Sequence, residues 1–238
     1  MKICAAQIRP VKGDIQTNIE NHKRLIELAF SYQAETIIFP ELSLTGYEPA
    51  LAKELAINEN DSRLNEFQSM SDDSGVTIGV GVPTKNKDGI CISMILFHPE
   101  STRQVYSKKY LHADEEPFFV SGINAAVLAN NKNNIALAIC YELSVPEHSS
   151  NAFKMGAEIY MASVAKSAAG IEKASKSLSG IAKKYSMIAL MANCIGYCDN
   201  FESGGKTSVW DSKGLLIGQM NDTDEGIIMV NTDTMEII

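Results

Sequence analysis

Short runs of apolar residues recur along this chain, and segments with helical periodicity separate them. The clearest runs cover residues 2–8, 36–39, 76–82, 134–139, 158–163 and 187–192. Runs of this length predict buried β-strands, because helices of globular proteins are usually longer. A chain that alternates such strands with helices is restricted to the α/β class, and we expect one domain over residues 1–238.

The segments between these runs predict the helices. The clearest covers residues 14–34, where Asp14 is suited to cap the helix and a stripe follows at helical spacing. This stripe consists of Ile15, Ile19, His22, Ile26 and Ala29. We expect further helices over residues 50–70, 145–156 and 170–186, and further strands over residues 90–97, 104–107, 206–210, 215–219 and 226–231. Residues 108–122 fit neither type of element.

The composition excludes several classes of protein. A charged fraction of 21% and a hydrophobic fraction of 45% are typical of a globular protein. The net charge of −8 disfavours nucleic acid as a partner, because phosphate binding requires clustered Lys and Arg. No stretch approaches the ~18 apolar residues of a membrane span, and the N-terminal apolar run is shorter than that of a signal peptide. We therefore expect a cytoplasmic protein with no membrane partner.

The cysteines raise the question of a nucleophile. They number five, at positions 4, 91, 140, 194 and 198, and this odd, scattered set fits a reducing compartment better than a disulfide framework. Cys194 and Cys198 alone are a weak signal for a metal, and the histidines are scattered. We therefore expect no metal and no cofactor.

Three short segments carry residues suited to catalysis. Glu41 directly follows an apolar strand, where α/β active sites form, and partial burial there would raise its pKa towards that of a general base. Lys108 is suited to stabilise an oxyanion. Cys140 ends a buried strand at the turn into a helix, where backbone N–H groups lower the pKa of a thiol. Each residue has a plainer alternative, namely an exposed loop acid, a solvated lysine and a structural cysteine.

In this order, the three segments resemble motifs of the carbon–nitrogen hydrolase, or nitrilase, superfamily. The matches are Pro40-Glu41, the segment from Tyr106 through Lys108 to Leu111, and Cys140-Tyr141-Glu142. Weaker matches lie at Ala5-Ala6-Gln7, at Asn193 and Gly196, and at residues 205–214. The resemblance implies a four-layer α-β-β-α sandwich in which two mixed sheets pack face to face.

The resemblance also implies the chemistry, which is thiol-dependent hydrolysis of C–N bonds other than peptide bonds. Cys140 would be the nucleophile and form a thioester, and Glu41 would be the general base. Lys108 would stabilise the oxyanion together with the backbone N–H of Tyr141. The Tyr-x-Lys spacing of the family selects Lys108 over its neighbour Lys109. We predict an amidase or an N-carbamoyl amidohydrolase that acts on a small linear amide.

Four residues are expected around the substrate, namely Glu115, Tyr141, Glu142 and Lys166. Many members of the family have a second glutamate after the lysine, and its spacing to a Phe and a Gly points to Glu115, with Glu116 as the competitor. Lys166 follows a strand of small residues and would suit an acidic substrate. The alternative for Lys166 is a surface lysine at the start of the next helix.

Several alternatives to an amidase stay open. One is a nitrile hydrolase of the same superfamily, and another is an inactive member that only binds a partner. A metal-dependent phosphodiesterase is the third, although it would need late metal ligands and no histidine follows His148. Many members carry an Arg where this chain has Ser144, so binding of a substrate carboxylate by that Arg does not carry over. The resemblance implies a homodimer or a higher homo-oligomer that pairs through residues 145–156 and 166–186.

Overall fold

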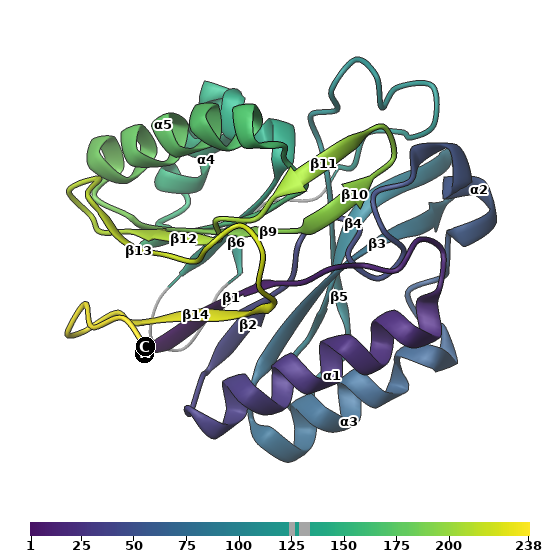
Figure 1. Ribbon diagram of the computed structural model, residues 1–238, viewed down its shortest axis with the longest axis horizontal. Coiled ribbons are helices and arrows are strands. Elements are labelled where there is room, and N and C mark those ends of the chain that lie inside the picture. The colour runs from purple at the N-terminus through teal and green to yellow at the C-terminus, as the bar shows by residue number, and fades with distance from the viewer. Residues whose placement is uncertain (124–126, 129–133) are drawn as a thin grey trace.

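The computed structural model describes residues 1–123, 127–128 and 134–238. Two six-stranded sheets lie face to face, and helices cover their outer faces (Figure 1). In Figure 1, α4 and α5 lie above one sheet, and α1 and α3 lie below the other. The α-β-β-α sandwich expected from the resemblance is therefore confirmed.

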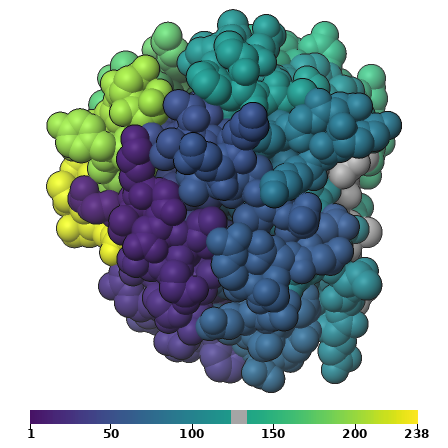
Figure 2. Space-filling view, turned by 90° about the vertical axis from the view of Figure 1, so that its right-hand side faces the viewer, coloured from purple at the N-terminus to yellow at the C-terminus, as the bar shows by residue number. Residues whose placement is uncertain are grey.

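The first sheet is mixed and has the strand order β14-β1-β2-β3-β4-β5. Its strands are β1 (Lys2–Gln7), β2 (Thr36–Ile38), β3 (Thr77–Asn86), β4 (Gly89–Phe97), β5 (Gln104–Ser107) and β14 (Gly226–Asn231). β1, β2 and β3 run parallel, whereas β4, β5 and β14 pair antiparallel with their neighbours. The first and last strands of the chain are thus partners, and purple and yellow atoms lie side by side on the face in Figure 2.

The second sheet is also mixed and has the order β13-β12-β9-β8-β7-β6. Its strands are β6 (Val127–Leu128), β7 (Ile135–Ile139), β8 (Ile159–Val164), β9 (Ile188–Asn193), β12 (Ser208–Trp210) and β13 (Leu216–Gln219). β7, β8 and β9 run parallel. A separate hairpin of β10 (Ile195–Cys198) and β11 (Phe201–Gly204) projects from the C-terminal end of β9 (Figure 1).

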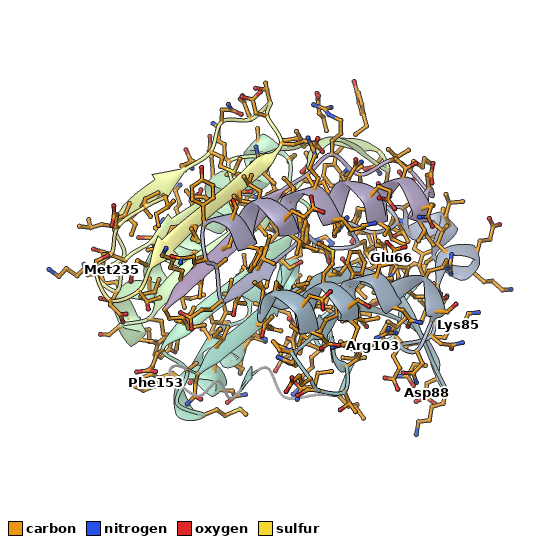
Figure 3. All side chains as sticks on the ribbon, turned by 90° about the horizontal axis from the view of Figure 1, so that it is seen from below. Glu66, Lys85, Asp88, Arg103, Phe153 and Met235 are labelled. Carbon is orange, nitrogen blue, oxygen red and sulfur yellow. The ribbon has the colours of Figure 1, made fainter. Side chains whose placement is uncertain are left out.

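The helices bury one stripe each. They are α1 (Ile15–Ser31), α2 (Ala52–Leu55), α3 (Asn65–Ser74), α4 (Pro146–Lys154) and α5 (Ala168–Tyr185). Asp14 caps α1 as predicted, since its carboxylate accepts a hydrogen bond from the backbone N–H of Thr17, and the whole predicted stripe is buried. α1 and α3 lie side by side in Figure 3, in which Glu66 of α3 is labelled. The Glu66 carboxylate pairs with the Lys23 ammonium of α1 at 2.6 Å. No helix among the described residues is long and apolar enough to cross a membrane.

Three layers of apolar side chains hold the sandwich together. The middle one joins the two sheets, with Ile38 and Met94 of the first sheet in the same cluster as Leu137 and Met161 of the second. The outer two lie between each sheet and its helices, one under α1 and α3 and one under α4 and α5. Strands that are buried on both faces explain why the sequence shows continuous apolar runs in place of alternation.

The predicted helix over residues 50–70 is wrong. Before α3 begins at Asn65, the segment contains the 3₁₀ turns Pro49–Leu51 and Ser62–Leu64 and the four-residue helix α2, Ala52–Leu55. Ile57 is captured by the first sheet, where its backbone N–H donates to the carbonyl of Pro83. Tertiary hydrogen bonds therefore override the helical pattern here. The other predicted elements agree with the structure to within a few residues, but the β10–β11 hairpin was not predicted.

Candidate active site

Cys140 lies at a sharp turn between β7 and the 3₁₀ turn Cys140–Ser144. Its φ of +43° falls in the left-handed region, which costs a non-glycine residue about 1–3 kcal/mol. The thiol is partly exposed, whereas the other four cysteines are buried. A strained turn that presents one thiol at the end of a parallel strand is typical of a nucleophile.

Glu41 follows β2 in a loop that packs directly on β3. The backbone N–H of Leu44 donates to the carbonyl of Gly81, and a Cβ at Gly81 would lie 2.2 Å from the carbonyl oxygen of Pro40. Only glycine therefore allows the loop to approach this strand. From the other side, the Nε2 atom of His22 accepts a hydrogen bond from Ser43 at 2.9 Å, because its Nδ1 faces the carbonyl of Asn18. These contacts fix the Glu41 main chain.

Lys108 follows β5 and is fully buried. Its ammonium donates to Glu41 at 2.7 Å and to Glu115 at 2.6 Å. The backbone N–H of Gly122 donates to the Lys108 carbonyl at 2.7 Å, and a Cβ at Gly122 would lie 2.3 Å from the carbonyl oxygen of Ser107. A buried lysine between two carboxylates keeps its charge, since each acid offsets part of the penalty of burial.

Glu115 is the second glutamate at the lysine. Its carboxylate also accepts hydrogen bonds from the Tyr47 hydroxyl at 2.9 Å and from the backbone N–H of His112 at 2.8 Å. Glu116 is exposed and lines a different cavity. Of the two acids that the sequence left open, the structure thus brings Glu115 to Lys108.

The charges of the site set its pKa values. Burial raises the pKa of the Glu41 carboxyl, and the Lys108 ammonium opposes this rise. Burial alone would lower the pKa of Lys108, but Glu41, the thiolate form of Cys140 and Glu115 together raise it. Burial raises the pKa of the Cys140 thiol to about 11, with a further rise from Glu41, while Lys166 and Lys108 lower it. At neutral pH the lysine is charged and the thiol is protonated.

The two oxygens of Glu41 have different surroundings. Oε1 accepts the hydrogen bond from Lys108, whereas the buried Oε2 has no hydrogen-bond partner among the described residues. A buried carboxylate oxygen without a partner is rare in proteins, and it is suited to accept a proton.

Cys140 opens into a cavity of about 470 Å³. Its walls come from distant parts of the chain, namely residues 47, 49–50, 112, 114–115, 118, 140–141, 165–167, 170 and 199–201. Atoms from the first third, the middle and the last part of the chain also meet on the face in Figure 2. A cavity of this size suits a small molecule.

Three of the predicted substrate-binding residues, Glu115, Tyr141 and Lys166, line this cavity. Glu142 lies elsewhere. Its carboxylate is fully buried and accepts hydrogen bonds from the Tyr106 hydroxyl at 2.5 Å and from the backbone N–H groups of Ile139 and Lys109. We therefore revise its role from substrate binding to positioning, because it ties the cysteine turn to the segment that carries Lys108.

Sequence reasoning missed several residues of the site. Tyr47, Asp199 and Phe201 line the cavity, the last two from the tip of the unpredicted β10–β11 hairpin. The Asn193 side chain accepts a hydrogen bond from the backbone N–H of Lys166 and donates one to the Lys166 carbonyl. Asn193 belongs to one of the weaker motifs, but nothing in the sequence indicates that its side chain fixes the main chain of Lys166.

The described residues offer little for a metal. Within residues 1–123, 127–128 and 134–238, no group of three or more His, Cys, Asp or Glu side chains is arranged to hold an ion. Cys194 and Cys198 are buried free thiols.

Comparison with known proteins agrees with this geometry. The sequence profile of the family described as "Carbon-nitrogen hydrolase" matches residues 2–237. A glutamine-dependent NAD(+) synthetase of Thermotoga maritima is 24% identical over 99% of this chain and 42% of its own length. A nitrilase of Pyrococcus abyssi is 24% identical over 67% of this chain and 63% of its own length. The chain thus spans less than half of the synthetase.

Solved structures share the fold. An amidase from Nesterenkonia sp. AN1 superposes with a TM-score of 0.88 at 20% identity and covers 97% of this chain and 92% of that protein. Another structure of that amidase, with a TM-score of 0.87 at 20% identity over 97% of this chain and 89% of that one, carries the acetamide moiety of fluoroacetamide at its active-site cysteine.

Proposed function

The chain belongs to the carbon–nitrogen hydrolase family, and we propose that it hydrolyses the C–N bond of a small linear amide through a thioester on Cys140. The observation that carries this proposal is the free Oε2 of Glu41 beside a charged Lys108, in a buried site that opens through Cys140 into a cavity. The Nesterenkonia amidase, whose structures include one in complex with butyramide, supports an amide as substrate.

In the first half of the reaction, the Cys140 thiol loses its proton to Glu41 Oε2 as sulfur attacks the amide carbon. A base is required because the raised pKa leaves the thiol protonated at neutral pH. Two of the three N–H groups of Lys108 are used by Glu41 and Glu115, and the third is available for the oxyanion. The proton then passes from Glu41 to the leaving nitrogen, the C–N bond breaks, and ammonia leaves a thioester on Cys140.

The second half uses the same groups. Glu41 takes a proton from water, the resulting hydroxide attacks the thioester carbon, and Lys108 again faces the oxyanion. The thiolate leaves and regains its proton from Glu41, and a carboxylic acid is released. No step in this sequence uses a metal ion or a redox cofactor.

The proposal is tested by Cys140→Ala. Hydrolysis should fall below detection in an assay of ammonia release over small amides, ω-amides including glutamine, and N-carbamoyl compounds, while the circular dichroism spectrum stays that of the wild type. Cys91→Ala is the matched control, because Cys91 is a buried thiol in β4 outside the cavity. Activity that survives Cys140→Ala would overturn the proposal, and loss of activity with EDTA would favour the phosphodiesterase.

A further inference from the structure

Lys166 lies on the wall of the cavity that contains Cys140. The two residues follow the same ends of neighbouring parallel strands, since β7 and β8 pair in register with Ile139 opposite Ser163. The positive charge of Lys166 lowers the pKa of both Cys140 and Glu41. Its ammonium group is therefore within electrostatic reach of the atoms that would react.

The main chain of Lys166 is fixed. Its N–H donates to Asn193 Oδ1 at 2.9 Å, and its carbonyl accepts from the Asn193 amide at 3.1 Å. The same carbonyl accepts from the Ser203 hydroxyl at 3.0 Å and from the backbone N–H of Gly204 at 2.9 Å. A surface lysine at a helix start would need no such clamp.

The Lys166 ammonium is not directly paired with an acid of the described residues. No hydrogen bond or ion pair to it occurs within the part of the chain that the structure describes. Two of the acids that line the cavity are already paired, Glu115 with Lys108 and Asp114 with His112. The third, Asp199, helps to raise the pKa of Lys12 and has no ion pair with Lys166. A substrate anion would therefore find Lys166 available.

We propose that Lys166 selects amides that carry a carboxylate a short chain away from the amide carbon. This inference rests on the proposed amidase function and names its substrate class. The carboxylate would pair with the Lys166 ammonium while the amide carbon lies at the Cys140 sulfur. Because Lys166 and Cys140 line one cavity, a single small substrate can contact both.

The test compares succinamate with 4-oxopentanamide, in which a methyl group replaces one carboxylate oxygen and removes the charge. We expect the wild type to favour succinamate by about tenfold or more in kcat/KM. Lys166→Met should bring the ratio between the two substrates to within about threefold of one, and Lys166→Arg should keep the preference. Lys173→Met is the matched control, since it removes an exposed positive charge from α5, the helix that begins two residues after Lys166, and should leave the ratio at the wild-type value.

Two results would overturn the inference. One is a wild type that shows no preference, and the other is a Lys166→Met variant in which both substrates lose rate in parallel, because Lys166 would then act on the reacting atoms. Succinate binding by isothermal titration calorimetry needs no turnover and keeps this test separate from the proposed function. We expect Lys166→Met to weaken that binding about tenfold and Lys173→Met to leave it unchanged, even if no amide is hydrolysed; equal binding to all three proteins would contradict the role of Lys166.

Discussion

The Cys140 thiol combines a strained backbone with a raised pKa of about 11. A helix start or a nearby cation usually lowers the pKa of a catalytic cysteine. Here burial and the charge of Glu41 outweigh the two lysines. The position of Cys140 at the turn predicts a lowered pKa, and the burial of the site reverses that prediction. The consequence is a neutral nucleophile that depends on its base.

The substitution Glu41→Gln separates the effect of the Glu41 charge on the Cys140 pKa from the role of Glu41 as the general base. Because the negative charge of Glu41 helps to raise the pKa of Cys140, its removal should let the thiolate form at lower pH. Amide hydrolysis should nevertheless fall about 10²–10⁴-fold, since the general base is lost. The measurements are the pH dependence of Cys140 alkylation by iodoacetamide, followed by peptide mass spectrometry, and the release of ammonia. Glu116→Gln removes an exposed charge and should change neither; a thiolate that forms at higher pH in Glu41→Gln would contradict the assignment.

His22 should make the protein less stable in acid. Burial lowers the pKa of His22 to about 4, whereas the pKa of a histidine in the unfolded chain is near 6.5. Between pH 6.5 and about pH 4, His22 therefore binds a proton in the unfolded chain but not in the folded chain. The contribution of His22 to stability is complete above pH 6.5 and is lost as the pH falls from 6.5 to about 4. Between pH 7 and pH 5 the loss amounts to about 2 kcal/mol.

Urea unfolding at these two pH values measures this loss. In His22→Gln the contribution is absent, so the difference in stability between pH 7 and pH 5 should be about 2 kcal/mol smaller than in the wild type. Other titrating groups, including Glu41, cancel in this comparison. An equal loss in both proteins would show that His22 is not the responsible group.

At the level of elements, strands that are buried on both faces are the easiest part of this fold to predict from the sequence. The runs at β7, β8 and β9 could be recognised because strands that pack against both a sheet and a helix layer are mostly apolar on both faces. The structure of segment 50–70 was not predicted correctly, because it depends on backbone hydrogen bonds between Ile57 and β3. The β10–β11 hairpin has only four residues in each strand, and glycines and polar residues interrupt its apolar residues, so no strand pattern stands out.

Some residues of the candidate site could likewise be predicted from the sequence, and others could not. Glu41, Lys108 and Cys140 each follow a strand, and they could be found from the sequence because their order matches the motifs of the family. Tyr47 and Asn193 act through distant contacts, which only the folded chain brings together. Glu142 was misjudged because its place beside the cysteine suggested a contact with substrate, whereas the turn directs its carboxylate into the protein.

Gly81 links β3 to the Glu41 loop and should not tolerate a side chain. In Gly81→Ala the new Cβ would meet the carbonyl of Pro40 at 2.2 Å, and the loop with Glu41 would have to shift. We expect a loss of about 1–3 kcal/mol in the free energy of unfolding and a clear fall in kcat. Gly180→Ala is the matched control, because Gly180 lies within α5 and nothing stands within 4 Å of its added Cβ.

The control should respond in the opposite direction. Replacing a helical glycine by alanine stabilises a protein by about 0.5–1 kcal/mol, and Gly180 lies outside the cavity, so activity should not change. Urea unfolding and amide hydrolysis of both variants check the pair. A Gly81→Ala protein with wild-type stability and kcat would mean that the loop has room to adjust.

At the scale of the whole molecule, the two sheets depend on each other. Each sheet contributes one wall of the middle core, and the last strand β14 closes the first sheet beside β1. Neither half keeps its inner face covered without the other. We therefore propose that residues 1–238 form one domain, in which the cavity and its catalytic candidates persist only while both sheets are paired.

One domain should unfold in one step, and the chain carries probes in both sheets to test this. Trp210, the only tryptophan, lies in β12 of the second sheet, while the buried thiols Cys4 and Cys91 lie in β1 and β4 of the first. Because the sheets share the middle core, we expect the fluorescence of Trp210 and pulse labelling of both thiols by iodoacetamide to report the same urea midpoint. If Cys4 and Cys91 became reactive well before the fluorescence changed, the first sheet would open alone, and the shared core would not couple the two halves.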